Sequence, residues 1–368
     1  MTRAIIHVDM DYFYAAIEER EDPSLSGKAV VVCMYSGRGG GSGSVSTCNY
    51  PARDAGIYSG MPCSRAKSID PDAIFLPVRK EFYTSVSESV MEILRQYADT
   101  APDGTKTFEQ VSIDEAFLDI TKATDGNLEL AQDIGMRIKE EVKEHEHITC
   151  SVGVGPNKLI AKMASSVRKP DGITIIKPED VGDFLKGMEL TSLWGIGKVT
   201  GEKLEQIGIK TTEQLAAHDV IDLITVFGKK KGTWLKKAAS GVDESVVKEK
   251  SGSEQIGRIA TLPQNSRDTE LIFQTIDKLV EDVIDKLDSR GLSFRLVTVT
   301  AITSDFKTHT NSRTLNHHVS DRNILRDTAR EMLIAFISET TLDLRRIGVR
   351  VGNLQKSSGQ STLFDYLE

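Results

Sequence analysis

The stretch Val111-Ser112-Ile113-Asp114-Glu115-Ala116-Phe117-Leu118-Asp119 places two adjacent carboxylates between apolar residues that predict a buried pair of strands. Burying two negative charges side by side costs several kcal/mol unless cations or hydrogen-bond donors neutralise them. Asp114 and Glu115 therefore need a compensating charge, and a divalent metal ion is the simplest one. The alternative is a strand-to-strand turn with solvated acids, and the pair taken alone favours that turn.

A second acidic site occurs near the N-terminus, in the run Ala4-Ile5-Ile6-His7-Val8-Asp9-Met10-Asp11. Asp9 and Asp11 are two residues apart, so their side chains share a face while the chain stays extended. Mg²⁺ prefers carboxylate and phosphate oxygens to Cys or His. Two acidic strand ends brought together in one sheet would hold two metal ions for an in-line phosphoryl displacement. The second site thus makes the metal interpretation of the first one the better hypothesis.

The composition is that of a soluble protein with two or more domains: 368 residues, 39% hydrophobic and 27% charged. No apolar run reaches the length of a membrane span, and acids interrupt residues 1–15, where a signal peptide would lie. We therefore expect no membrane association. The four cysteines show no CxxC spacing, which disfavours a zinc site or a disulfide framework and favours the cytoplasm.

The net charge of −8 is weak evidence against nucleic-acid binding, because Lys and Arg on phosphates drive that binding. From Leu190 to Gly241, however, eight Lys stand against five acids, a local net charge of +3. Basic surfaces on an acidic protein are therefore compatible with the composition.

Two motifs together, His7-Val8-Asp9-Met10-Asp11-Tyr12-Phe13-Tyr14 and Ser112-Ile113-Asp114-Glu115, resemble the Y-family translesion DNA polymerases, in the archaeal-type DinB branch. The resemblance covers nearly the whole chain except the last dozen or so residues. It continues through Asn49-Tyr50-Pro51-Ala52-Arg53, Gly153-Val154-Gly155, Asn157-Lys158, Lys162 and Arg346-Ile347-Gly348-Val349-Arg350. It implies a DNA-templated DNA polymerase that extends primers past damaged bases, with low fidelity, and with low processivity in the absence of a clamp.

Apolar spacing predicts amphipathic helices over 79–97 and 128–145 and a strand over 148–154. The order strand, helix, acidic hairpin, helix, strand predicts a ferredoxin-like βαββαβ palm. A second βαββαβ unit follows the polar stretch 240–253. We expect its strands at 256–260, 295–301, 308–315 and 345–351, and its helices at 269–287 and 323–337.

The resemblance implies an α+β right-hand polymerase built from this palm, small fingers, a helical thumb and a little finger. The expected segments are the palm 1–10 and 78–168, fingers 11–77, thumb 169–240, linker 241–253, little finger 254–353 and a flexible tail 354–368.

The site residues are carried over from the resemblance position by position. Asp9, Asp114 and Glu115 are the expected catalytic acids, and with the carbonyl of Met10 they would hold two Mg²⁺ ions. Tyr14 is the expected steric gate, whose ring excludes the 2′-hydroxyl of a ribonucleotide. The expected triphosphate ligands are Tyr50, Arg53 and Lys162, and the residues expected against the nascent base pair are Met34, Ser44 and Met61.

Two features keep alternatives open. The loop Ser36–Ser44 is rich in Gly and Ser, but it lacks the GKS/T ending of a P-loop, so a mobile surface loop is favoured over a phosphate cradle. A helix from Pro156 to Val167 follows two glycines and carries two lysines on one face, which favours anions at its N-terminus. Of these lysines, Lys158 has the alternative of a plain surface charge.

Two regions are expected to hold DNA. Leu193 to Leu204 has the pattern of a helix-hairpin-helix, in which Gly195, Gly197 and Lys198 would meet a phosphate; a plain turn between two helices, without a function in DNA binding, is the alternative. Phe227 to Gly232 is a candidate degenerate second copy. In the little finger the expected DNA contacts are Arg258, Arg295, Arg313, Arg346 and Arg350, although the sequence does not settle which of them face outward.

The tail after the Ser/Gly spacer carries apolar residues, which suggests a docking peptide; a frayed end is the alternative. It resembles sliding-clamp peptides of both the trimeric-ring and the bacterial kind. The residues expected to bind the clamp are Gln360, Leu363, Phe364 and Tyr366.

The principal hypothesis is thus a monomeric polymerase that binds primer-template DNA, deoxynucleoside triphosphates and a clamp. Another palm enzyme, such as a nucleotidyl cyclase, is one alternative, but it has no use for the helix-hairpin-helix or the second βαββαβ unit. A DNA-binding scaffold that has lost catalysis is the other, and intact acids at both sites argue against it.

Overall fold

The computed structural model describes residues 2–39, 41–249 and 255–357. The chain divides into two compact units, which are considered separately. The first comprises Met1–Met34, Ser44–Met61 and Arg65–Lys250, and the second comprises Tyr35–Gly43, Pro62–Ser64 and Ser251–Glu368. Among the residues described, no helix is both long and apolar enough to cross a membrane.

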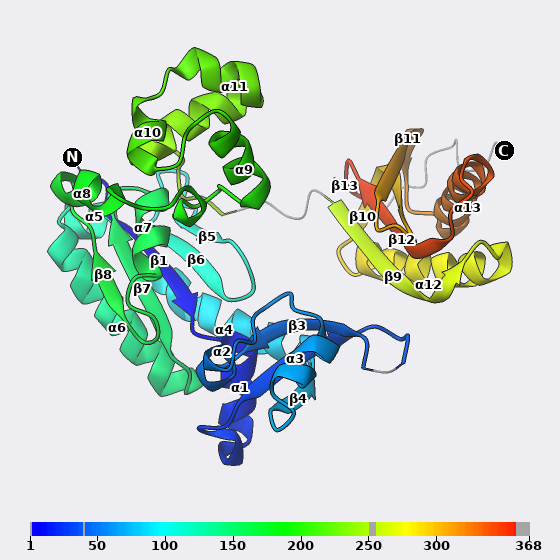
Figure 1. Cartoon of the computed structure of the whole chain (residues 1–368), viewed down its shortest axis with the longest axis horizontal. Helices are drawn as coiled ribbons and strands as arrows, with labels where there is room; N and C mark the ends of the chain where they lie inside the picture. The colour runs from blue at the N-terminus through cyan, green and yellow to red at the C-terminus, as the bar shows by residue number, and fades with distance from the viewer. Residues whose placement is uncertain (1, 40, 250–254, 358–368) are drawn as a thin grey trace. The chain divides into compact units, whose positions relative to one another are not determined.

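The palm is a five-stranded sheet in which β1 lies between β6 and β7 (Figure 1), in the order β5-β6-β1-β7-β8. The four strands β7-β1-β6-β5 have the predicted ferredoxin-like order, to which β8 adds a parallel edge. The strands are β1 (Ile5–Met10), β5 (Phe108–Gln110), β6 (Glu115–Asp119), β7 (Cys150–Gly155) and β8 (Ile173–Ile175). Because β8 belongs to this sheet, the palm extends beyond the boundary expected at residue 168.

The two faces of the palm sheet are covered differently. Ile6, Val8 and Met10 point to one face, where they join the core formed with the two long helices α4 (Lys80–Tyr97) and α6 (Leu128–Glu146). These helices match the predicted ranges to within a residue. The other face carries Ile5, His7 and Asp9 by alternation and is covered by α7 (Lys158–Ser165). The acidic strand end therefore lies on the face covered by α7.

Two glycines let α7 approach the sheet closely. A Cβ at Gly153 would lie 2.0 Å from the carbonyl oxygen of Ala161, and one at Gly155 would lie 3.0 Å from the amide nitrogen of the same residue. Any larger residue at Gly153 would therefore push α7, and Lys162 with it, away from β1.

The fingers contain a three-stranded sheet of order β3-β2-β4 and short helices. Their elements are α1 (Phe13–Glu21), η1 (Pro23–Leu25), β2 (Val30–Tyr35), β3 (Gly43–Cys48), α2 (Tyr50–Asp54), α3 (Cys63–Ile69) and β4 (Ile74–Pro77). The Gly/Ser-rich segment is the turn between β2 and β3, closed by a 2.8 Å hydrogen bond from the Ser36 amide to the Ser42 carbonyl.

The thumb is helical, and its apolar core continues into α7 through Leu159, Ile160 and Met163. Its elements are η2 (Pro178–Asp180), α8 (Val181–Leu185), η3 (Leu190–Ser192), α9 (Lys198–Gln206), α10 (Thr212–Ala217) and α11 (Val220–Ala239). The small helix α5 (Thr121–Thr124) belongs to the palm.

The segment after α11, expected to be a polar linker, packs in part against the palm. Val247 is buried against Ile5, Phe117 and Ala161 of the palm.

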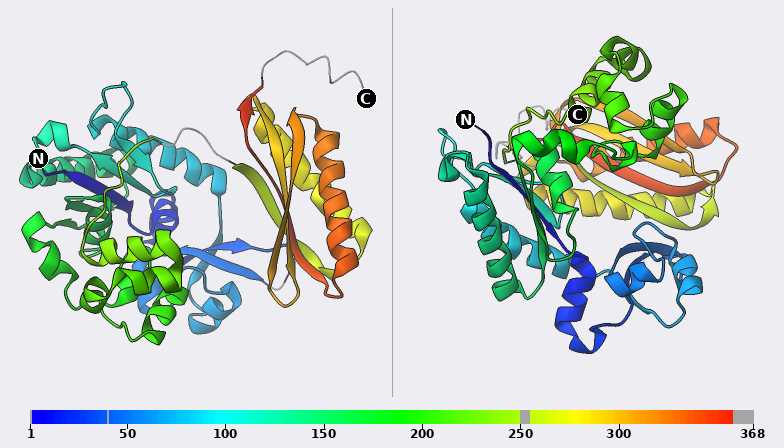
Figure 2. Two further views of the ribbon diagram at one scale, coloured as in Figure 1. Left: turned by 90° about the horizontal axis from the view of Figure 1, so that it is seen from above. Right: turned by 60° about the vertical axis from the view of Figure 1, so that its left-hand side comes forward.

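The second unit contains a four-stranded antiparallel sheet of order β11-β10-β12-β9, with α12 and α13 on one face (Figure 2). The elements follow the predicted βαββαβ order, but the strand order differs from that of the palm. They are β9 (Gln255–Ser266), α12 (Thr269–Asp288), β10 (Leu292–Thr303), β11 (Thr308–Val319), α13 (Arg322–Glu339) and β12 (Leu344–Gly352). The short strand β13 (Gln355–Lys356) pairs with β10, so the little finger extends past the boundary expected at 353.

Candidate active site

The two acidic motifs meet where β1 and β6 pair. In this antiparallel register Asp9 lies opposite Glu115, and the amide of Met10 donates a 2.9 Å hydrogen bond to the carbonyl of Asp114. Asp114 itself lies in the turn of residues 111–114, just before β6, rather than inside a strand. The alternative prediction of a turn between two strands is therefore correct for the backbone at Asp114. The acids themselves are half-buried, whereas that alternative expected them to be solvated.

The charges of these acids act on one another. Burial, together with the negative charges of Asp9 and Glu115, raises the pKa of Asp114. Burial also opposes ionisation of Glu115, but His7 and the ammonium group of Lys162 outweigh it and lower the pKa of Glu115 to about 2. The raised pKa of Asp114 reflects its burial first and the repulsion of the neighbouring carboxylates second, and a further cation at this place would oppose both effects.

Each acid is turned toward its own partner. Glu115 forms an ion pair with Lys162, Asp9 forms one with Lys169, and Asp114 accepts a 2.5 Å hydrogen bond from the hydroxyl of Ser112. In this arrangement no three His, Cys, Asp or Glu side chains of the described chain converge into a metal cage. The donors nevertheless suit Mg²⁺, since they are carboxylate oxygens from adjoining strand ends and small side-chain rotations would aim them at a shared ion.

Asp11 does not join this group, although it was expected to share a face with Asp9. It is buried and accepts three hydrogen bonds of 2.8 Å, from the hydroxyls of Thr149 and Ser151 and from the amide of Asp171. The strand ends at Met10, and the chain then turns through Tyr12, whose φ is +36°. Asp11 therefore has a structural function, which is to hold the loop around Asp171.

Three residues near the acids were missed or misjudged in the sequence. His7 is buried, 2.8 Å through Nδ1 from the hydroxyl of Ser165, with Nε2 3.6 Å from Glu115. Burial lowers the pKa of His7, so the ring beside Glu115 is neutral. Lys169 had no assigned function. Lys158 is not the surface charge that was considered, because it is buried in a 2.6 Å ion pair with Glu109.

Tyr50 begins α2 and Arg53 lies in the last turn of this short helix, and the two side chains lie together, as their spacing predicts. The guanidinium carbon of Arg53 is 5.0 Å from the centre of the Tyr50 ring, and Nε of Arg53 donates a 3.0 Å hydrogen bond to the carbonyl of Cys48. Arg53 is exposed. The hydroxyl of Tyr50 is buried and meets no hydrogen-bond partner among the residues described. Burial, helped by the charge of Asp11, raises the pKa of Tyr50, so the hydroxyl is a neutral donor near the acids. A phosphate oxygen is a suitable acceptor for it.

Tyr14 is supported from behind by a rigid cluster. Its ring stacks on that of Tyr83, with ring centres 4.3 Å apart and planes at 17°. Tyr83 is fully buried and donates its hydroxyl to Glu18, which also accepts two hydrogen bonds from Arg79, of 2.8 and 2.6 Å. Burial and the nearby charge of Asp114 raise the pKa of Tyr14. The ring thus has a fixed position beside the acidic turn.

Comparison with known proteins agrees with this geometry. Residues 8–166 match the impB/mucB/samB family, 253–363 match its C-terminal domain, and 178–209 match its helix-hairpin-helix motif. DNA polymerase IV of Methanosarcina acetivorans is 63% identical over 366 residues, covering 100% of both chains, and that of Nitrosopumilus maritimus is 37% identical over 99% of both. The chain belongs to the Y family of DNA polymerases, in its DinB branch.

Solved structures of this family have the same fold. A Y-family polymerase chimera of Dbh and Dpo4 has a TM-score of 0.88 at 35% identity, covering 95% of this chain and 98% of the other. An insertion ternary complex of Dbh DNA polymerase has a TM-score of 0.68 at 35% identity and the same coverage. The chain is therefore a DNA-directed DNA polymerase that copies template DNA past damaged bases.

The helix-hairpin-helix of this Y-family chain lies in the thumb, where it was predicted. Gly195 has φ of +92°, and a Cβ there would lie 2.5 Å from the ring of Trp234, so only glycine fits. Gly197 is the N-cap of α9, which leaves the first amides of that helix available to a phosphate, and the side chain of Lys198 is 88% exposed. Gly228, with φ of +78°, interrupts α11 in the region of the candidate second copy.

The strand register of the little finger places the five predicted arginines in different positions, some on the face covered by helices and some on the face without helices. Arg346 and Arg350 alternate with core residues of β12, so they point to the face without helices. Arg313 pairs with Val297 on the helix-covered face and forms a 2.6 Å ion pair with Glu331 of α13. Arg258 lies opposite Val349, also on that face, at the edge strand. Arg295 lies in a β-bulge and donates to the Leu315 carbonyl.

The other predicted site residues are those expected to contact the nascent base pair and the sliding clamp. Met34 is the next-to-last residue of β2, with 55% of its surface exposed, and Ser44 is exposed on the neighbouring strand β3. Met61 is buried, which removes it from the surface expected against the base pair. The clamp residues Gln360, Leu363, Phe364 and Tyr366 lie outside the described residues.

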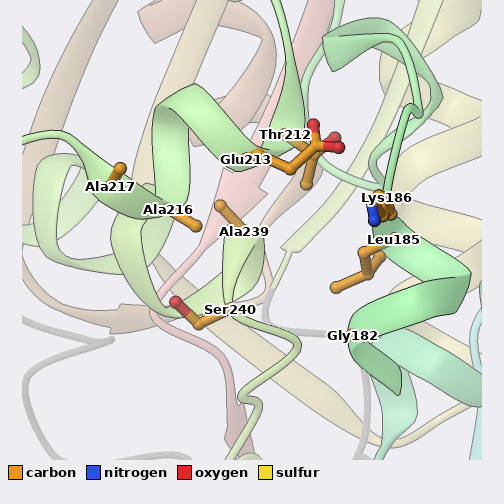
Figure 3. Close-up of a pocket in the computed structure, with 9 residues that line it drawn as sticks. All are labelled: Gly182, Leu185, Lys186, Thr212, Glu213, Ala216, Ala217, Ala239 and Ser240. Carbon is orange, nitrogen blue, oxygen red and sulfur yellow. The ribbon is translucent and has the colours of Figure 1, made fainter. Parts of the chain in front are cut away.

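A separate pocket of about 410 Å³ lies in the thumb (Figure 3). Its lining includes none of the three candidate catalytic acids, Asp9, Asp114 and Glu115. Its walls are mostly small or apolar side chains of α8, α10 and α11, namely Gly182, Leu185, Lys186, Thr212, Glu213, Ala216, Ala217, Ala239 and Ser240. This pocket is therefore distinct from the acidic site of the palm.

Proposed function

We propose that this polymerase joins deoxynucleotides to a primer by a two-metal mechanism at Asp9, Asp114 and Glu115. The observation that carries the proposal is the register of β1 with β6, which puts Asp9 opposite Glu115 with Asp114 next to both. These acids and the carbonyl of Met10 would hold two Mg²⁺ ions, which supply activation of the primer 3′-hydroxyl and neutralisation of the pyrophosphate leaving group.

The chain's own residues would bind and orient the nucleotide. Tyr50 offers its unpartnered hydroxyl, and Arg53 offers a planar donor fork to the phosphates. Lys162, now on Glu115, would turn its ammonium group to the triphosphate. These donors stabilise the negative charge that moves to the leaving group as the bond breaks. Tyr14 would face the sugar, and Met34 and Ser44 would face the new base pair.

We also propose that the enzyme is a monomer that works in the cytoplasm and copies DNA with low fidelity. Its processivity is low unless a sliding clamp binds its C-terminal peptide. The glycines and Lys198 of the helix-hairpin-helix would hold the duplex through its phosphates, without reading sequence.

Arg346 and Arg350 give a direct test of the DNA-binding face of the little finger. We expect the double change Arg346→Ala, Arg350→Ala to weaken binding of primer-template DNA about tenfold and to make it less dependent on salt, because two phosphate contacts are lost. Fluorescence anisotropy at several salt concentrations measures both effects. Arg313→Ala is the matched control, since this arginine pairs with Glu331 on the other face. Equal losses in both proteins would contradict the assignment.

Primer extension on an undamaged template with Mg²⁺ tests the proposal as a whole. Extension by the native chain supports it. Tight binding of primed DNA without extension would favour a DNA-binding scaffold that has lost catalysis. Formation of a cyclic nucleotide in the absence of DNA would favour a nucleotidyl cyclase.

A further inference from the structure

His7 is a buried polar ring on the face of the palm sheet that α7 covers. It alternates with Ile5 along β1 and lies opposite Phe117 of β6, with the two ring centres 4.5 Å apart. Its side chain is fully buried. A histidine at such a place loses its hydrogen bonds to water, so its ring nitrogens need partners within the protein. The mechanism proposed for the acids makes no use of this ring.

The two ring nitrogens of His7 have different neighbours. Nδ1 lies 2.8 Å from the hydroxyl oxygen of Ser165. Nε2 is buried without a hydrogen bond to any residue that the structure describes, and it lies 3.6 Å from the carboxylate oxygen Oε2 of Glu115. The ammonium group of Lys162 is paired with the same oxygen. Lys162 therefore occupies the acceptor that Nε2 would otherwise use.

The surroundings of His7 select its tautomer. The neutral ring has one N–H, and if that proton were on Nδ1, the lone pair of Nε2 would face the negative charge of Glu115. A proton on Nε2 avoids this repulsion and requires Nδ1 to accept a hydrogen bond from the hydroxyl of Ser165. That hydroxyl also lies 2.7 Å from the carbonyl oxygen of Lys162, but it has a single proton. Its bond to His7 therefore decides which ring nitrogen is the donor.

We propose that His7 is a positioning residue for Glu115: its Nε2–H holds this carboxylate once Lys162 has turned to the triphosphate. The inference rests on the proposed function, in which Glu115 is a metal ligand and Lys162 a phosphate ligand. When Lys162 leaves, a shift of Nε2 from 3.6 Å to about 3.0 Å gives Glu115 a new hydrogen bond. Because this donor is neutral, it fixes the orientation of the carboxylate and leaves its negative charge to the metal.

Three substitutions at His7 separate the functions of its two nitrogens. The side-chain amide of Gln reaches the position of Nε2, that of Asn reaches only the position of Nδ1, and Phe keeps a ring without nitrogen. We expect His7→Phe and His7→Asn to lower kcat for nucleotide addition about tenfold and to leave the KM for the deoxynucleotide within about twofold, because the donor acts after the nucleotide is bound. His7→Gln should keep kcat within about threefold of the native value.

A metal-free experiment tests the same contact. Lys162→Met reproduces the departure of Lys162 without metal or nucleotide. In EDTA, we expect His7→Phe to lower the melting temperature by about 3 °C more in the Lys162→Met protein than in the native one, since His7 is then the remaining donor to Glu115. Nitrogen-15 NMR of histidine-labelled protein observes the donor itself. The Nε2–H resonance that is absent from His7→Gln should shift when Lys162→Met is introduced.

The outcomes separate this inference from the proposed function. Equal kcat values of His7→Phe and His7→Gln, or additive effects of the His7 and Lys162 changes on the melting temperature, would overturn the positioning inference alone. A proton found on Nδ1 instead of Nε2 by NMR would do the same. A Glu115→Ala enzyme that adds nucleotides at the native rate would remove Glu115 from the metal site, and with it the inference that depends on that site.

Discussion

Replacing Tyr14 by alanine should allow the enzyme to add ribonucleotides, with a loss of sugar discrimination of about 10²-fold or more. The Tyr14 ring cannot easily move aside, because it stacks on Tyr83, and Glu18 and Arg79 hold Tyr83 in place. A fixed ring at the sugar leaves no room for a 2′-hydroxyl. Alanine opens that space, whereas the acids and the phosphate donors stay where they are, so addition of deoxynucleotides should persist.

The measurement is the ratio of kcat/KM for dATP to that for ATP in single-nucleotide addition opposite template thymine. Tyr97→Phe is a suitable control, because the Tyr97 hydroxyl bonds to Glu141 on the palm helices and has no contact with Tyr14. A Tyr14→Ala enzyme that extends primers with native sugar discrimination would show that Tyr14 is not the gate.

Asp114→Ala should lower the rate of nucleotide addition by at least about 10³-fold, equivalent to about 4 kcal/mol in the activation barrier. The change removes one of three carboxylates from the metal site, and neither Asp9 nor Glu115 can take over a position in the turn before β6. Binding of primer-template DNA should not weaken, because a negative charge is lost near the phosphates.

The two effects are measured by single-turnover extension and by anisotropy. Asp103→Ala is the matched control: this aspartate lies in the exposed turn before the same hairpin and caps Thr105. Its rate should be native. If Asp114→Ala retained more than about a tenth of the native rate, the assignment of this acid to the metal site would be wrong.

Much of the palm could be predicted because its signals are local. The apolar stripe that includes Val86 and Val90 defined α4, and two acids beside apolar strand residues marked each half of the site. The resemblance then related the halves, which are about a hundred residues apart in the chain. The structure adds the register that makes Asp9 the neighbour of Glu115.

Other features depend on long-range packing, which a single sequence does not contain. Asp11 has the same type and spacing as a metal ligand, but three donors from elsewhere in the chain give it a structural function. The faces of Arg313 and Arg346 depend on strand pairing and bulges, and a shift of one residue would exchange them. Lys169 lies outside every motif used, and only its contact with Asp9 reveals it.

The most direct test of the central claim is the dependence of single-turnover nucleotide addition on Mg²⁺ by the native chain on primed DNA. If Asp9, Asp114 and Glu115 hold two metal ions, addition should be absent in EDTA and should rise with Mg²⁺ more steeply than binding of one ion allows. Addition that persists in EDTA, or its absence at saturating Mg²⁺ although primed DNA is bound, would contradict the account.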